Sequence, residues 1–148
     1  MTDREKWLAL AERCEKATGP DREIDYLVSA AVGNIPEGCR RNGAFSWICP
    51  RPSLMTVTYH SPVSYTASLD AITDLIEREL PKAGWEVCGG KTRDKIASRA
   101  WTWLAWAWFE GSGILGKSVS RAKTPALALC AAFCRAKAEM CGDEAKDE

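Results

Sequence analysis

The sequence has little of what marks several common classes of protein. Among 148 residues there is a single histidine, His60, and 20 basic side chains are matched by 20 acidic ones. No apolar run approaches the ~18 residues of a membrane-spanning helix. A balanced charge lacks the basic surplus that drives nonspecific binding to DNA or RNA, and it gives no attraction to an acidic membrane. We therefore expect no membrane association and do not favour nucleic acid as the partner.

Cysteine is present, but without the spacing of a metal site. The seven cysteines include no C-x2-C pair of the kind that binds zinc, so we expect no metal and no cofactor. Cys39 and Cys49 fall in a predicted loop as free thiols, and Cys130 and Cys134 are expected to be small buried side chains. The odd cysteine count, and a charged beginning from Met1 to Lys6 without a signal-peptide apolar segment, favour a reducing cytoplasm.

Hydrophobic periodicity and capping residues predict a mixture of helices and strands. Helical spacing of apolar residues predicts helices over residues 3–17, 21–33, 68–80 and 124–140. The last of these begins at Thr124-Pro125, a threonine cap followed by proline. Strands are predicted over 54–59, 85–88, 100–110 and 114–121. Residues 34–53 are predicted as a long loop with a short strand at 45–49, and the acidic tail 142–148 as frayed.

A predicted strand rich in tryptophan indicates how the faces of the sheet are covered. Trp101 and Trp103 share one face of an extended segment, and Trp106 and Trp108 share the other. Either both faces of the sheet are covered, or a bulge near residues 104–105 returns the side chains to one face. We predict one α/β domain over 1–148, an α+β sandwich with a mainly antiparallel sheet covered by helices on both faces.

Three separated stretches carry a family resemblance. They are LALAERCE at 8–15 with TGPDREID at 18–25, YTASLDA at 65–71, and TPALALCAA at 124–132. In order and separation they resemble the phage ABA-sandwich domain, a family of small phage and prophage proteins. The tryptophan-rich strand and Arg40-Arg41 match no pattern of that family. The resemblance implies an α/β sandwich of phage origin in a bacterial host cell, and it supplies no settled activity and no catalytic residues.

A glycine-rich motif suggests nucleotide binding. The stretch GSGILGKS at 111–118 satisfies G-x-x-x-x-G-K-[ST]. In a P-loop the backbone around Gly111 and Gly116 would cradle phosphate, while Lys117 would reach the β- and γ-phosphates and Ser118 would hold Mg²⁺. A helix should then begin at 117–118, but Thr124-Pro125 starts one later. A hairpin turn is therefore favoured, and a nucleotide-dependent enzyme is kept as an alternative.

No residue set has the pattern of a catalytic centre. His60 would have to serve as the base of any triad, and its place after a strand favours an exposed strand end. Basic residues at 91–99 precede four tryptophans that could stack bases, and the α-β-β-β-α order from residue 68 is that of a double-stranded-RNA-binding domain. A nucleic-acid-binding module is therefore a second alternative.

Candidate ligand-binding residues lie in or beside the family stretches and on the tryptophan strand. They are Arg22, Asp25, Tyr65, Asp70, Trp101 and Trp103. Each also has a structural interpretation, since Asp70 suits the first turn of a helix and tryptophans on strands commonly belong to a core. We expect a non-enzymatic phage or prophage accessory protein. It would bind a host or phage protein or a small ligand, as an inhibitor or sponge of a host system.

Overall fold

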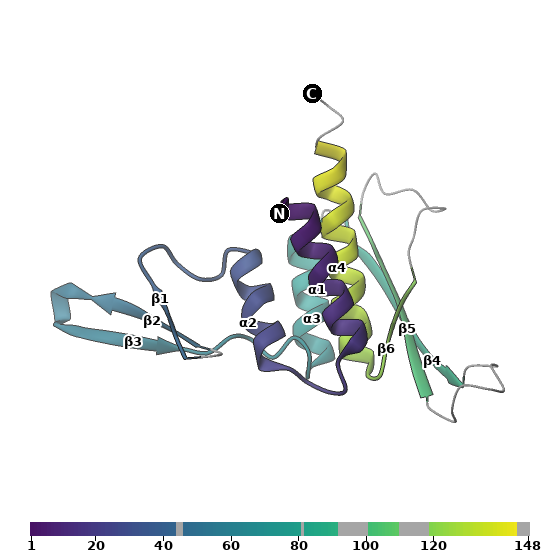
Figure 1. The fold of residues 1–148 in the computed structure, drawn as a ribbon, viewed down its shortest axis with the longest axis horizontal. Coiled ribbons are helices and arrows are strands. Elements are labelled where there is room, and N and C mark those ends of the chain that lie inside the picture. The colour runs from purple at the N-terminus through teal and green to yellow at the C-terminus, as the bar shows by residue number, and fades with distance from the viewer. Residues whose placement is uncertain (44–45, 81, 92–100, 110–118, 145–148) are drawn as a thin grey trace.

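The fold combines helices with antiparallel strands. The computed structural model describes residues 1–43, 46–80, 82–91, 101–109 and 119–144. This part of the chain contains four α-helices, one 3-10 turn and two three-stranded antiparallel sheets (Figure 1). The predicted α+β class is confirmed, and its strands are divided between two sheets.

Helix α4 (Pro125–Glu144) is the centre of the core. Every side chain from Ala126 to Cys134 on this helix is buried. Its alanines and cysteines are small, so α1 (Asp3–Lys16), α3 (Leu69–Glu79) and a sheet pack closely around it (Figure 1). On the α1 side, the Trp7 ring meets Phe133 edge-on at 5.7 Å between centroids. A helix that is hydrophobic on all sides is stable in water only when other elements cover it, and α4 is covered in this way over residues 126–134.

The second sheet consists of β4 (Gly84–Lys91), β5 (Trp101–Trp108) and β6 (Ser120–Ala122), in the order β4-β5-β6. Pairing between β4 and β5 runs without interruption from Gly84–Trp108 to Lys91–Trp101, so no bulge shifts the tryptophans to one face. The described helices lie on one side of this sheet (Figure 1), against buried Ala105 and Ala122. The expected cover on both faces is therefore seen on one face within the described residues.

The first sheet projects from the helices beside α2 (Arg22–Ala31) (Figure 1). It consists of β1 (Arg40–Asn42), β2 (Ser46–Arg51) and β3 (Thr56–His60), in the order β1-β2-β3, with the turn η1 (Pro52–Leu54) between β2 and β3. We call residues 40–60 the β-arm. The short strand expected at 45–49 is confirmed as β2, which extends to Arg51. The loop expected around it is wrong for β1, because pairing with β2 holds residues 40–42 extended.

The last helix is longer than expected. Helix α4 continues to Glu144, past the predicted end at Met140, so residues 142–144 are helical where the sequence predicted a frayed tail. The rest of that tail, 145–148, lies outside the described residues. Within the described chain, no helix combines the length and apolar character needed to cross a membrane.

Candidate functional site

Three of the predicted ligand-binding residues come together where α2 begins. The buried Asp25 carboxylate accepts hydrogen bonds from the Arg22 guanidinium at 2.9 Å and from the Thr66 backbone N–H at 2.8 Å. Arg22 also donates to Ser64 Oγ at 2.8 Å. The Tyr65 hydroxyl, equally buried, accepts a hydrogen bond from the Asn34 amide. The bonds of Arg22 and Asp25 tie the first turn of α2 to the segment that precedes α3, and the bond of Tyr65 ties the same segment to Asn34, beyond the end of α2.

Burial of the Asp25 carboxylate in this cluster disfavours its charged form. Burial raises the pKa of Asp25 above its ordinary value, and the bonds from Thr66 and Arg22 offset part of that rise. Both carboxylate oxygens already accept bonds from the chain itself. The arrangement therefore supports a structural role, and a ligand-binding role for Arg22, Asp25 and Tyr65 stays a prediction.

The other three predicted residues lie apart from this cluster. Asp70 is exposed in the first turn of α3, which Ser68 caps. Trp103 is half-buried against the core, and its ring lies so close to Gly89 that an added Cβ would stand 2.9 Å from it. Trp101 lies on β5 opposite Lys91. The structure does not gather these residues into a common site with Arg22.

The glycine-rich motif falls mainly outside the described residues. Gly111, Gly116, Lys117 and Ser118 lie in the undescribed range 110–118, as does most of the expected strand 114–121. The described chain resumes at Val119 and forms strand β6 from Ser120, with α4 beginning at Pro125. A P-loop continues directly into a helix, so the observed order fits the turn interpretation better.

Three cysteines meet between α1 and α4. Cys14, Cys130 and Cys134 are fully buried, which confirms the expected burial of the last two. Hydrogen bonds from Cys130 and Cys134 lower the pKa of Cys14 to about 5, whereas bonding to Cys134 and Cys14, together with burial, raises the pKa of Cys130. Among the described residues, no group of three or more His, Cys, Asp or Glu side chains could hold a metal ion.

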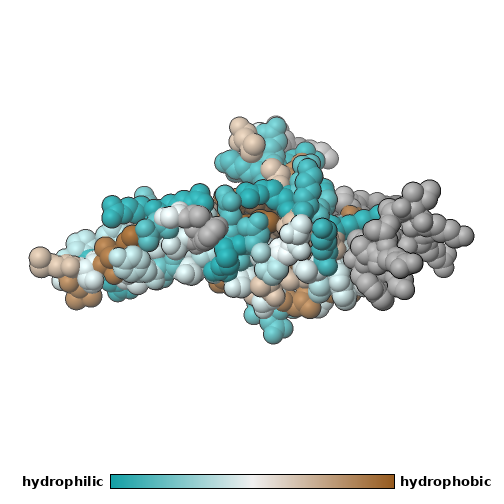
Figure 2. Space-filling view, turned by 60° about the horizontal axis from the view of Figure 1, so that its bottom comes forward, coloured by the Kyte–Doolittle hydropathy of each residue, from teal (hydrophilic) through white to brown (hydrophobic). Residues whose placement is uncertain are grey.

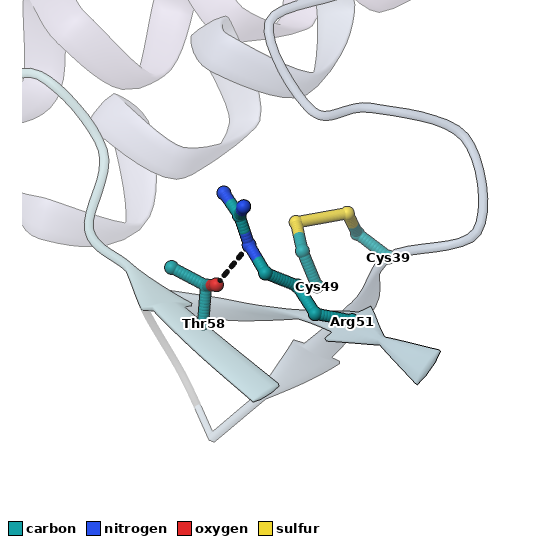
Figure 3. The surroundings of a disulfide bond; sticks show 4 residues. All are labelled: Cys39, Cys49, Arg51 and Thr58. Carbon is teal, nitrogen blue, oxygen red and sulfur yellow. Dashed lines mark hydrogen bonds between the residues drawn. A yellow bond between two sulfur atoms is a disulfide. The ribbon is translucent and has the colours of Figure 1, made fainter. Parts of the chain in front are cut away.

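Cys39 and Cys49 form a disulfide, so the expectation of free thiols in this segment is wrong (Figure 3). The bond joins the segment before β1 to the middle of β2, which places the two cysteines side by side. On the same face, Arg51 Nε donates to Thr58 Oγ1 at 2.8 Å. A shallow hollow is lined by both cysteines, Arg51, His60 and residues 36–38. The inner face of the β-arm is therefore cross-linked by a disulfide and mixes polar with apolar side chains.

The outer face of the β-arm carries exposed apolar side chains beside Arg40. Strand pairing places Arg40 opposite Ile48 and Ile48 opposite Tyr59, in one row across the three strands. Val57 lies on the same face, one row nearer the tip. Tyr59 is 68% exposed, and Met55 at the tip is 95% exposed. Figure 2 shows hydrophobic atoms near the free end of the arm.

Side-chain contacts anchor the arm to α2. The Arg41 guanidinium lies 4.4 Å from the centre of the Tyr26 ring and 3.9 Å from the Glu23 carboxylate. Beside them, the Trp47 ring meets Tyr26 at 6.2 Å between centroids. Sequence reasoning missed this candidate site, although Arg40-Arg41 and the alternating strand at 54–59 were visible signals.

The chain was compared with known proteins at three levels. No family model matches it, and neither does any curated protein or solved structure.

Proposed function

We propose that this chain is a non-enzymatic accessory protein that binds a partner protein through the β-arm. One observation carries the proposal. Of nine large hydrophobic side chains that are exposed in the described residues, four lie on the β-arm, Leu54, Met55, Val57 and Tyr59, and a fifth, Val63, follows it closely. An apolar surface concentrated on a projecting element is typical of a protein interface.

The chemistry of the arm favours an acidic partner. Residues 34–64 contain three arginines, no lysine and one glutamate. Tyrosine, methionine and arginine are enriched in protein interfaces, and lysine is depleted there. We infer that Tyr59 and Ile48 contact an apolar patch on the partner, while Arg40 meets a carboxylate at its rim. The apolar side chains favour a protein over a nucleic acid, whose binding surfaces are much more positively charged.

The remaining expectations from the sequence belong to this proposal. Phage origin and action as an inhibitor or sponge are compatible with a small binding protein. The Cys39–Cys49 disulfide weighs against the expected reducing cytoplasm, because disulfides are rare in that compartment. Both carboxylate oxygens of Asp25 accept hydrogen bonds from the chain itself, which supports a structural role for this cluster.

The experiment uses a photo-cross-linking amino acid at position 59 in the bacterial host. A matched probe at Glu12, exposed on α1, is the control. We expect an adduct between position 59 and a protein other than this chain, and no adduct from position 12. With that partner purified, Tyr59→Ala should weaken binding at least about tenfold, as loss of a central aromatic side chain does. Arg40→Glu should slow association, because it places like charges together at the rim. Equal adducts from both positions, or unchanged affinity in both variants, would contradict the proposal, as would an adduct to nucleic acid alone.

A further inference from the structure

Strand β3 has an unprotected edge. The order β1-β2-β3 leaves its outer side without a partner strand in the described chain. Such an edge presents a row of unpaired N–H and C=O groups, and proteins commonly block it with lysine, proline or a bulge. Residues Thr56–His60 read Thr-Val-Thr-Tyr-His, and they pair with β2 in continuous register. None of the usual blocking devices is present along this strand.

The other free edge of the arm is protected. Strand β1 contains Arg40 and Arg41 in succession. Pairing β1 with β1 of another copy would bring arginines of the two chains together, and like charges on neighbouring strands are destabilising. Strand β3 contains no Asp, Glu, Lys or Arg, so its self-pairing meets no such repulsion.

We propose that β3 pairs antiparallel with β3 of a second copy of this chain, across a two-fold axis at Thr58. Full overlap of the strands places Val57 opposite Tyr59 of the second copy, and Thr56 opposite its His60. Pairs of an aromatic and a β-branched residue stabilise antiparallel sheets. An interface related by a two-fold axis uses the same patch on both chains and closes as a dimer. The two arms then form one six-stranded sheet.

The same symmetry accounts for the other exposed apolar side chains near β3. Leu54 and Met55 lie just before the strand, and Val63 lies just after it. In an antiparallel pair, the beginning of one strand lies beside the end of the other. Val57 and Tyr59 therefore lie within the paired strands, and each end of the contact is flanked by Leu54 and Met55 of one copy and by Val63 of the other.

This inference goes beyond the proposed function and does not depend on it. Pairing uses the edge of β3 and leaves the outer face, with Arg40 and Ile48, open to a different protein. Two short strands bury less than the roughly 1,200 Å² of a standard stable interface. We therefore expect a dimer that forms only at higher protein concentration. Disulfide cross-linking detects such a dimer better than size-exclusion chromatography does.

The test is disulfide cross-linking of the purified protein alone, with cysteines at two positions that the proposed strand register places opposite each other. Val57→Cys and Tyr59→Cys are made separately in a Cys88→Ser background, because Cys88 is an exposed free thiol. Residues directly opposite in an antiparallel pair have Cα atoms about 4.5–5.5 Å apart, which suits a disulfide. Under mild oxidation, mixing the two variants should give cross-linked heterodimer at least about tenfold faster than either variant gives homodimer.

Two controls make the result decisive. Leu69→Cys, at an exposed position of α3, should not cross-link with either variant. Adding Thr58→Lys to both partners places two lysines at the axis and should abolish the heterodimer, while circular dichroism shows the fold retained. Heterodimer that forms no faster than homodimer, or that survives Thr58→Lys, would overturn the inference. Arg40→Glu tests the outer face and should leave this cross-link unchanged, so the two proposals can fail separately.

Discussion

The indole ring of Trp47 stacks on the imidazole ring of His60, with centroids 5.8 Å apart and planes at 16°. The two residues lie directly opposite each other on β2 and β3. Trp47 is 7% exposed and also contacts Tyr26 of α2. This residue therefore joins the two longer strands of the β-arm to the helical part of the molecule.

We expect Trp47→Ala to lower the free energy of unfolding by about 3 kcal/mol, the usual loss for a buried tryptophan. Trp47→Phe should cost much less. It keeps an aromatic ring against His60 and removes an indole N–H that is buried without a hydrogen-bond partner in the described structure. Urea denaturation measures both variants, with Tyr59→Ala on the exposed face as a control expected within about 0.5 kcal/mol of wild type. Equal losses in Trp47→Ala and Trp47→Phe would show that the ring contact is unimportant.

The Trp108 ring lies over Gly84, its partner residue on β4. A Cβ added at Gly84 would stand only 2.2 Å from the indole. Gly84→Ala should therefore destabilise the protein by about 1–3 kcal/mol, the range for an overpacked site. The loss should shrink when Trp108→Ala is also present, because the clash is then removed. Thermal unfolding of the single and double variants measures this coupling. Gly19→Ala, where an added Cβ has open space, is the control, and additive effects at Gly84 and Trp108 would count against the contact.

The helix starts could be predicted from the sequence because their caps are local. Asp21 accepts hydrogen bonds from the N–H groups of Glu23 and Ile24 at the start of α2. Ser68 caps α3 through Ala71, and the Thr124 hydroxyl accepts from the Leu127 N–H. In each case the partners lie within three residues, so short sequence windows contain the whole interaction.

The β-arm and the polar cluster depend on partners that are distant in sequence. Asp25 is bonded to Thr66, 41 positions away, and β1 is extended through its pairing with β2 and the Cys39–Cys49 bond. Periodicity within one segment carries no information about such partners. The sequence therefore singled out Arg22, Asp25 and Tyr65 as polar residues. It could not predict that Arg22 and Asp25 form hydrogen bonds with Ser64 and Thr66, the neighbours of Tyr65.

The Cys39–Cys49 disulfide should stabilise the β-arm rather than the helices. It closes a short loop, with a sequence separation of 10, for which chain entropy predicts about 3 kcal/mol. Reduction, or the Cys39→Ser and Cys49→Ser double variant, should reduce amide protection in β1 and β2 and leave α4 unchanged. Hydrogen exchange with mass spectrometry measures both regions, and Cys88→Ser serves as the control for loss of a thiol. Comparable loss of protection in α4 would show that the bond supports the whole fold.

The Asp25 carboxyl should titrate above its ordinary range, because burial raises its pKa in the folded state. Its folded pKa then exceeds the unfolded value, so the folded protein binds the proton more tightly. The resulting contribution to stability is present below the unfolded pKa of about 3.9 and is lost as pH rises through the folded pKa. The free energy of unfolding of wild type, relative to Asp25→Asn, should therefore fall with increasing pH across that interval.

Carboxyl NMR titration checks the same shift directly. The Arg22 guanidinium, 2.9 Å from Asp25, favours the ionised carboxylate, so Arg22→Met should raise the Asp25 pKa further. Arg13→Met, which removes a half-exposed partner of Glu23 on the neighbouring surface, is the matched control and should leave it unchanged. An Asp25 pKa at the ordinary value and insensitive to Arg22→Met would mean that the carboxylate is solvated. A pKa below the ordinary value would mean that the bonds from Thr66 and Arg22 outweigh burial, and would contradict the prediction.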